Sequence, residues 1–240
     1  RTQAEADRAA VGGRARSRVS GVSMRVLVTA GPTREPIDPV RYIGNRSSGR
    51  MGYAIARAAV GRGHAVRLVS GPVALPDQGG VATFRVTTAE EMLSAVLEHV
   101  GWCDCLIMAA AVADLRPAAA SAGKLKKDAG PPQLFLEPTP DILKTVAGEK
   151  GRRIFVGFAA ETENVLAGAA AKLASKGLDL IVANDVSQPD AGFDVETNIV
   201  TFIGPAGVIK ALPLMSKDDV AEEIVEWVEK AGLESGQSAE

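Results

Sequence analysis

The sequence has little of what most disulfide frameworks and metal sites require, because its 240 residues include only two cysteines and two histidines. Cys103 and Cys105 lie in one apolar run, and we interpret them as reduced strand residues of a cytoplasmic protein rather than as a disulfide. His64 and His99 belong to no cluster with the spacing of metal ligands. A histidine- or cysteine-ligated metal site is therefore not expected.

Long apolar runs and an excess of charge of one sign are also missing. No stretch approaches the roughly 18 apolar residues of a membrane-spanning helix. The formal net charge is -2, which provides no general attraction to nucleic acid or to a membrane. A content of 46% hydrophobic and 23% charged residues is typical of a globular protein with a buried core. We therefore expect neither nucleic acid nor a membrane as a partner.

Short apolar strands alternate with amphipathic helices along the chain, which predicts an α/β fold with a doubly wound, mostly parallel sheet and helices on both faces. The predicted strands are 24–30, 64–71, 82–88, 103–111, 152–160 and 178–185, and the predicted helices are 49–61, 88–100, 163–176 and 216–232. A hairpin is expected near 198–214. Ser47 or Ser48 can cap the first helix, and Thr88 with Glu91 forms a capping box.

The two ends of the chain have no apolar period. Residues 1–23 are rich in Arg, Ala, Gly and Ser, and we expect a flexible arm or an inter-domain linker there. Residues 233–240 are polar and predict a disordered tail. One domain, 24–232, remains between them.

Polar segments follow the predicted strands, and ligands in such sheets bind beyond the carboxyl ends of the strands. These segments are 31–39, 110–117, 157–162 and 183–190. The helix start near Ser48 and Gly49 offers backbone N–H groups to an anion, although an ordinary capped helix explains it as well.

Lysines suggest how a phosphorylated ligand is held. Lys124, Lys126 and Lys127 lie in a loop that can cover a triphosphate, although such charge runs are usually only solvated. Lys172 and Lys176 share one helix face. Either they contact the phosphates of a ligand, or they are simply an exposed lysine pair. The residues alone leave these alternatives open.

The sequence lacks the residues that several enzyme classes require. A nicotinamide-binding fold usually has an acid at the end of its second strand, where this chain reads LVSGP. Tyr42 and Tyr53 are the only tyrosines, and neither has the lysine four residues later that a short-chain dehydrogenase uses. The G-x-S-x-G elbow and the G-x-x-x-x-G-K-[ST] loop are missing as well.

The motifs that remain resemble one family. GPTREPIDPVRYIGNRSSGRMG (31–52), AAAVAD (109–114), KLKK (124–127), VGFAAET (156–162) and AKLASKGLDLIVANDVS (171–187) occur in the order found in bacterial phosphopantothenoylcysteine synthetase. The resemblance covers about 24–230 and implies a Rossmann-like fold. The family is often the C-terminal half of a bifunctional coenzyme A biosynthesis protein, behind a flavin-dependent decarboxylase, and residues 1–23 would then be the linker. A standalone synthetase with an extended N-terminus is the alternative.

The resemblance implies an activity and an assembly. The family joins 4′-phosphopantothenate to L-cysteine with CTP and a divalent ion, usually Mg²⁺. CTP converts the carboxylate into an acyl-cytidylate and releases pyrophosphate, and the cysteine amine then displaces CMP. The hairpin near 198–214 is similar to the family's dimerisation element, which implies a homodimer whose sites are completed across the interface.

The resemblance also assigns residues, position by position. Asn45 and Lys124 match catalytic residues. Phosphopantothenate is expected at Arg41, Asn45, Ser47, Ser48 and Ala111. CTP is expected at Met108, Ala109, Ala110, Asp114, Lys124, Thr139, Pro140, Asp141, Ile142, Phe158, Lys172 and Lys176.

The metal is expected to be held mainly by the nucleotide phosphates, with help from Asp114. Two positions depart from the family pattern: Arg50 stands where Lys is frequent, and Thr139 where Asn is common. A non-catalytic nucleotide-binding module of the same fold is the alternative function. Asn45, Lys124 and Asp114 together argue against that alternative.

Overall fold

The computed structural model describes residues 23–126, 133–161, 165–185 and 195–237. The predicted N-terminal linker therefore lies almost wholly outside the described residues, and so does Lys127. In the described part of the chain, none of the helices combines the length and apolar character that crossing a membrane requires.

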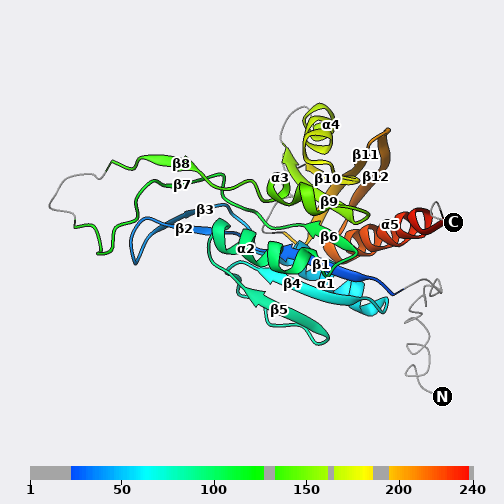
Figure 1. Cartoon of the computed structure of the whole chain (residues 1–240), viewed down its shortest axis with the longest axis horizontal. Coiled ribbons are helices and arrows are strands. Elements are labelled where there is room, and N and C mark those ends of the chain that lie inside the picture. Colours follow the sequence, from blue (N-terminus) through cyan, green and yellow to red (C-terminus); the bar gives the residue numbers. More distant parts are fainter. Residues whose placement is uncertain (1–22, 127–132, 162–164, 186–194, 238–240) are drawn as a thin grey trace, which may run out of the picture.

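An eight-stranded sheet forms the centre of the molecule, in the order β12-β11-β10-β9-β6-β1-β4-β5 (Figure 1). Six strands pair in parallel: β1 (Arg25–Ala30), β4 (Ala65–Ser70), β5 (Val81–Arg85), β6 (Cys105–Met108), β9 (Ile154–Glu161) and β10 (Leu180–Asp185). The antiparallel hairpin of β11 (Thr197–Gly204) and β12 (Gly207–Ser216) closes one edge. The mostly parallel sheet and the hairpin are confirmed.

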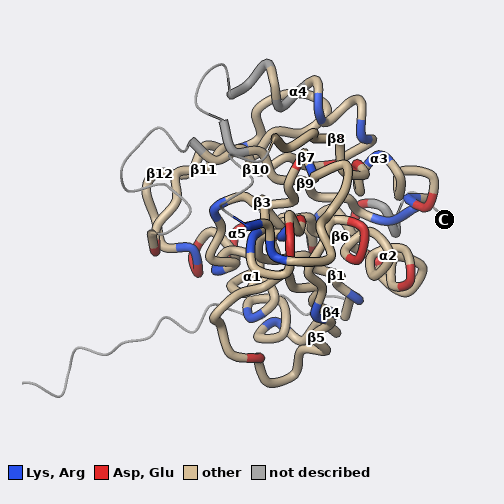
Figure 2. The backbone as a smooth tube through the Cα atoms, turned by 90° about the vertical axis from the view of Figure 1, so that its left-hand side faces the viewer, with Lys and Arg blue, Asp and Glu red and all other residues tan. Residues whose placement is uncertain are grey.

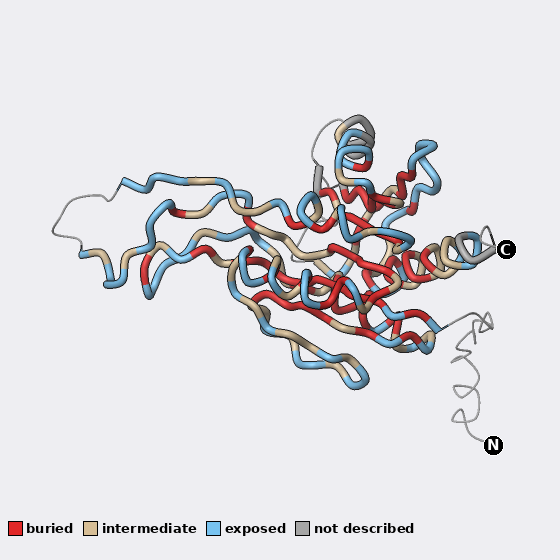
Figure 3. The backbone as a smooth tube through the Cα atoms, viewed as in Figure 1, coloured by how far each residue is buried: buried red, intermediate tan, exposed pale blue. Residues whose placement is uncertain are grey.

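Helices cover both faces of this sheet. The helices α1 (Arg50–Gly61) and α5 (Lys217–Gln237) enclose one core, and α2 (Ala89–Val100), α3 (Ile142–Val146) and α4 (Val165–Lys176) enclose the other. A short 3₁₀ turn, Ala147–Glu149, follows α3. Along β1, Val26 and Val28 enter the first core and Leu27 enters the second, because successive side chains of a strand alternate. The sheet is accordingly the most buried part of the molecule (Figure 3).

Two small sheets that the sequence analysis did not predict project beyond the strand ends. The strands β2 (Arg34–Pro36) and β3 (Tyr42–Gly44) form one, and β7 (Leu115–Pro117) and β8 (Leu136–Pro138) form the other. We call these two antiparallel pairs the arm, which extends to the left in Figure 1.

Helix ends test the capping predictions. The capping box of Thr88 and Glu91 is confirmed. The cap of α1 was predicted wrongly: it is Gly49, at φ 77°, and neither serine caps the helix, although Gly49 N donates to Ser47 Oγ at 3.3 Å. A Cβ at Gly49 would lie 2.6 Å from Val73 Cγ1, so both conformation and space require glycine. The helix α5 continues to Gln237, so residues 233–237 of the predicted disordered tail are helical.

Candidate functional site

Two adjoining cavities open where the parallel strands end. The first, of about 270 Å³, lies beside the start of α1, and we call it the α1 cavity. The second, of about 210 Å³, lies beside the start of α3, and we call it the α3 cavity. Ala110, Val112, Asp114 and Phe158 line both cavities and therefore form their common wall.

Most of the residues singled out from the sequence line these two cavities. The α1 cavity is lined by Asn45, Ser47, Ser48, Ala109, Ala110, Ala111, Asp114, Phe158 and Lys172. The α3 cavity adds Met108, Thr139, Pro140, Asp141, Ile142 and Lys176. Residues from five separate parts of the sequence thus meet at one edge of the sheet, and their individual roles stay predictions.

Hydrogen bonds between the extensions of β1 and β6 build the floor of the site. Ala111 N donates to Gly31 O at 2.9 Å, and Ala110 N donates to the hydroxyl of the buried Thr29 at 3.1 Å. The equally buried Thr33 accepts from Ala113 N at 2.9 Å. The two small-residue segments are therefore held side by side, and a flat ligand can approach the backbone at 109–113.

Asn45 lies between the arm and this floor. Its Nδ2 atom donates to the carbonyl oxygen of Val112 at 2.9 Å, and its side chain is exposed. A carboxamide has two N–H groups. One N–H group is therefore held by the protein, and the bond fixes the direction of the other.

Asp114 is an exposed carboxylate in the wall between the cavities. Its carbonyl oxygen accepts from Thr139 N at 3.0 Å, which attaches the start of the α3 region to the common wall. Within the described ranges, no three His, Cys, Asp or Glu residues gather as a metal site. Asp114 by itself fits a hard cation only if the ligand's oxygens supply most of the coordination.

The helix α4 supplies basic residues to the two cavities (blue positions on α4 in Figure 2). Lys172 lines the α1 cavity and Lys176 lines the α3 cavity, where Nζ of Lys176 lies 3.2 Å from Oδ2 of Asp141. Asp141 also caps α3 by accepting from Lys144 N at 3.2 Å. One helix therefore places positive charge along the length of the site.

Arg41 and Lys124 are the two predicted residues that do not line either cavity. Arg41 pairs with the buried Asp38 at 2.5 Å and donates to Leu125 O at 3.0 Å. Leu125 N donates back to Asp38 Oδ2 at 3.2 Å. Asp38 and Arg41 thus attach the segment that carries the exposed Lys124 to the arm, and this arrangement holds Lys124 away from the cavities.

This arrangement strongly favours the ionised form of Asp38 over the protonated form. The hydrogen-bonded Arg41 guanidinium holds the pKa of Asp38 well below its usual range, and backbone N–H groups of Val40, Leu125 and Arg41 act in the same direction. Burial opposes this shift but is the smaller effect. Asp38 is therefore ionised at neutral pH, and its charge holds Arg41 and the backbone of Leu125 in place.

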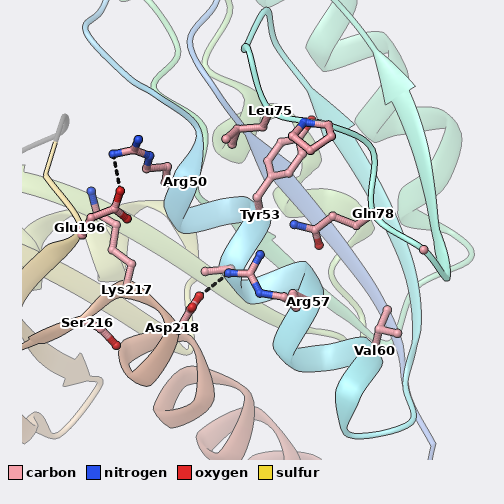
Figure 4. Close-up of a pocket in the computed structure, with 13 residues that line it drawn as sticks. Arg50, Tyr53, Arg57, Val60, Leu75, Gln78, Glu196, Ser216, Lys217 and Asp218 are labelled. Carbon is pink, nitrogen blue, oxygen red and sulfur yellow. Dashed lines mark hydrogen bonds and ion pairs between the residues drawn. The ribbon is translucent and has the colours of Figure 1, made fainter.

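A larger cavity of about 580 Å³ lies next to the site, between α1, the 75–79 segment and the start of α5 (Figure 4). None of the predicted residues lines it. Arg50, which pairs with Glu196 at 2.8 Å, and the buried Lys217 line both this cavity and the α1 cavity. Arg57 and Asp218, which form an ion pair, also line this larger cavity.

Four polar residues of the α1 cavity were given no site role by the sequence analysis: Arg50, Asn184, Asn198 and Lys217. Asn184 lies in the polar segment 183–190, which was flagged only as a whole. Asn198 is the second residue of β11 and Lys217 is the first of α5, and such positions carry no sequence signal for a cavity.

Comparison with known proteins identifies the family of this chain. Residues 22–231 match the family described as DNA/pantothenate metabolism flavoprotein C-terminal domain. The coenzyme A biosynthesis bifunctional protein CoaBC of Bacillus subtilis is 48% identical over 213 residues, which are 88% of this chain and 52% of that protein. The protein of the same name from Vibrio vulnificus is 48% identical over 207 residues, with 85% and 51% covered.

A solved structure is similar over nearly the same region. The crystal structure of the C-terminal domain of CoaBC superposes with a TM-score of 0.73 at 45% identity and covers 86% of this chain and 94% of that chain. The chain therefore spans about half the length of the two curated relatives and nearly all of the solved domain.

Proposed function

This chain belongs to the family of DNA/pantothenate metabolism flavoprotein C-terminal domains, and on that premise we propose that it is a CTP-dependent phosphopantothenate–cysteine ligase. Membership of the family confirms the resemblance carried by the sequence motifs. The observation that supports the activity best is the pair of adjoining cavities with a common wall at Asp114, because a reaction between two bound molecules requires two neighbouring subsites.

The α3 cavity suits the nucleoside of CTP. Thr139, Pro140 and Ile142 form its side near α3, and Phe158 offers an apolar surface in the common wall. Lys176 and Lys172 would follow the nucleotide toward the α1 cavity and neutralise its phosphates. Mg²⁺, when bound to the triphosphate, would supply charge neutralisation there, and Asp114 is the protein group placed to assist.

The α1 cavity suits 4′-phosphopantothenate, which is an anion at both ends. Ser47, Ser48 and the backbone N–H groups at the start of α1 offer donors to it. Its carboxylate would meet the α-phosphate of CTP near Asn45 and Asp114. A carboxylate oxygen then attacks the α-phosphorus, the bond to pyrophosphate breaks, and an acyl-cytidylate forms.

The second half of the reaction transfers the acyl group. The cysteine amine attacks the acyl carbon, the bond to CMP breaks with its electron pair, and the amine loses a proton. The free N–H of Asn45 would donate to the carbonyl oxygen as negative charge develops on it. Cys103 and Cys105 take no part, because the thiol in the product comes from the substrate.

The assembly that we propose is a homodimer in the cytoplasm. Arg41 and Lys124 lie outside the cavities of their own chain, and in a dimer they would serve the site of the partner. The hairpin β11–β12 stays the sequence-based prediction for the interface, and β12 is an edge strand with exposed Val208 and Ile209. The arm offers a second exposed apolar surface.

Fusion to a flavin-dependent decarboxylase, as in a bifunctional protein, would add to this assembly.

Pyrophosphate release tests the proposed function. The protein is incubated with CTP, Mg²⁺ and 4′-phosphopantothenate, with and without L-cysteine, and pyrophosphate, CMP and the new amide are measured. We expect turnover that depends on cysteine, with one pyrophosphate and one CMP for each amide formed. CTP binding without any pyrophosphate would instead identify a non-catalytic nucleotide-binding module. A titration with NAD(P)H, followed by fluorescence, tests the oxidoreductase alternative and should show no binding.

A further inference from the structure

Asn198 is a buried polar residue that the proposed reaction has not yet used. Its exposed fraction is 3%, and it lines the α1 cavity. Its Nδ2 atom donates to Sδ of Met51 at 3.5 Å. Its Oδ1 atom is buried and has no hydrogen-bond partner within the described part of the chain. A buried carbonyl oxygen that has lost water and gained no donor destabilises the unliganded fold.

Asn198 lies at the edge of the sheet where the parallel strands end and the cavities open. β11 runs antiparallel to β10, so the start of β11 lies beside the carboxyl end of β10. Val200 and Phe202, which follow at alternate positions on β11, are buried in the apolar core beneath α1 and α5. Asn198 is thus the polar end of an otherwise apolar row, at the point where that row reaches the cavity.

An irregularity in the hairpin acts on this same residue. The pairing of β11 with β12 shifts register between Asn198 and Val200. The extra residue lies on the partner strand β12, between Leu212 and Met215, and such irregularities increase the local twist and occur often beside functional sites. Burial, the unused oxygen and the register shift are three separate observations that coincide at one residue.

The other side chains of the cavity wall surround an Asn198 oxygen that still lacks a hydrogen-bond donor. Arg50, Lys172 and Lys217 contribute cations to the wall, and Ser47 and Ser48 contribute hydroxyl groups. The wall also carries the amides of Asn45 and Asn184 and the carboxylate of Asp114, which lies in the part shared with the α3 cavity. An amide oxygen only accepts hydrogen bonds, so a ligand that fills the α1 cavity satisfies Asn198 Oδ1 by presenting an N–H or O–H group.

We propose that Asn198 is a substrate-binding residue whose Oδ1 atom accepts a hydrogen bond from the amide N–H or the hydroxyl group of the pantothenate chain. This inference rests on the proposed function, because it assumes that 4′-phosphopantothenate occupies the α1 cavity. CTP presents its own donors in the α3 cavity, which Asn198 does not line. Asn198 therefore distinguishes the acyl substrate from the nucleotide.

The test compares Asn198→Leu with Thr83→Val. Thr83, on β5, also has a buried side-chain oxygen without a partner in the described residues, but it lines neither cavity of the site, so it is a matched control. For each protein, the KM and the dissociation constant are measured separately for 4′-phosphopantothenate and CTP. The thermal midpoint is recorded without ligand and with each ligand.

We expect Asn198→Leu to weaken 4′-phosphopantothenate binding about tenfold, as the loss of one hydrogen bond does. CTP binding should change less than twofold, and the thermal midpoint without ligand should change little, because Oδ1 has no protein hydrogen bond to lose and Nδ2 loses only its contact with Met51 Sδ at 3.5 Å. Thr83→Val should leave both affinities unchanged. If Asn198→Leu does not fold, Asn198→Ala removes the same oxygen without added bulk, and Asn198→Ser, which restores an acceptor, should recover part of the affinity.

The wild-type protein separates the two possible failures. If 4′-phosphopantothenate neither raises the thermal midpoint of the wild-type protein nor is converted by it, the proposed function is wrong, and this inference is wrong with it. If wild type binds this substrate and the Asn198 variants bind it equally well, only the inference is overturned. An equal loss of CTP affinity would show that Asn198 merely supports the fold of the site, which also overturns the inference.

Discussion

Asn45 on the arm side of the site and Val112 on its floor are joined by a hydrogen bond of 2.9 Å between Nδ2 and the carbonyl oxygen. This bond determines the direction of the second N–H of Asn45. We predict that Asn45→Ala lowers kcat on the order of 100-fold, equivalent to about 3 kcal/mol of barrier, because a donor to the oxyanion is lost.

The KM for CTP should change little in Asn45→Ala, because Asn45 does not line the α3 cavity. Single-turnover release of pyrophosphate and CMP provides the measurement. Asn45→Asp keeps the shape of the side chain without the N–H groups and should be equally slow. Full activity of Asn45→Asp would contradict the role of the amide.

Lys176 provides a second prediction, which concerns the nucleotide alone. Its ammonium group pairs with Asp141 at 3.2 Å and lines the α3 cavity. We predict that Lys176→Met raises the KM for CTP about tenfold, as expected for a lost charge-assisted contact, and leaves the KM for 4′-phosphopantothenate unchanged. Steady-state kinetics with one substrate varied at a time measures both values.

Lys144→Met is the matched control for Lys176→Met. Lys144 lies on α3 and is exposed, but its side chain lines neither cavity. Removal of the same charge there should leave the KM for CTP within about twofold, since exposed charges act weakly at physiological salt. Equal effects of the two variants would mean that only the general field of the protein acts on CTP.

Asp38 provides a prediction about pH. A carboxyl group whose pKa is lower in the folded protein stabilises the fold at pH above its unfolded pKa, about 4, and loses that contribution as pH falls toward the native pKa. Asp38→Asn should therefore unfold at lower urea concentration than wild type at pH 7. The difference should shrink as pH falls below about 4.

Urea titrations at pH 7, 5, 4 and 3, followed by circular dichroism, measure this difference for Asp38→Asn. Asp77→Asn removes a carboxylate that pairs with Arg85 at the same 2.5 Å but is mostly exposed, so it should differ little from wild type at any pH. A constant deficit of Asp38→Asn over the whole pH range would show that its packing, rather than its charge, stabilises the arm.

The two cysteines provide a chemical prediction. Burial raises the pKa of the Cys103 thiol to about 11, and it raises that of the fully buried Cys105 well above its ordinary value. The folded protein should therefore react with a disulfide reagent at pH 8 far more slowly than free cysteine does. Both thiols should react at once in denaturant, and ligase turnover should persist in Cys103→Ala. Rapid modification of the native protein would contradict this burial.

The strands of the sheet were predictable, whereas the polar residues that complete the site were not. Val26, Leu27 and Val28 belong to a short apolar run bounded by turn residues, a pattern that β6 and β10 repeat. The four arm strands have three residues each and three of them end in proline, so they show no apolar period. Such short strands depend on pairing with distant segments, which local sequence does not specify.

The site divides in the same way between local and distant determinants. Asn45 and Asp114 were identified because their motifs are contiguous in the sequence. Asn198 was missed, because its importance comes from contact with Met51, 147 positions earlier, and from a shift of register in its pairing with β12. Arg41 and Lys124 were grouped with the cavity residues, but the Asp38 network holds them outside it.

The interface of the proposed dimer can be located with two variants. Phe135, beside β8 in the arm, has an exposed fraction of 76%, the largest among the large hydrophobic residues of the described part of the chain, and Leu134 and Leu136 beside it are also exposed. Figure 3 shows how far the arm extends into solvent. Ile209, on the edge strand β12, is exposed to 49%. Contiguous exposed apolar surface of this kind is typical of protein–protein interfaces.

We predict that the wild-type chain is a dimer by light scattering and that Phe135→Glu converts it to a monomer, because a buried, unpaired carboxylate strongly opposes association. Ile209→Glu places the same charge on the sequence-predicted interface and should remain dimeric if the arm forms the contact. The reverse result would assign the interface to the hairpin. Because Arg41 and Lys124 lie on the arm side of the molecule, outside their own cavities, loss of the dimer through Phe135→Glu should also abolish turnover. A fully active monomer would show that each chain completes its own site.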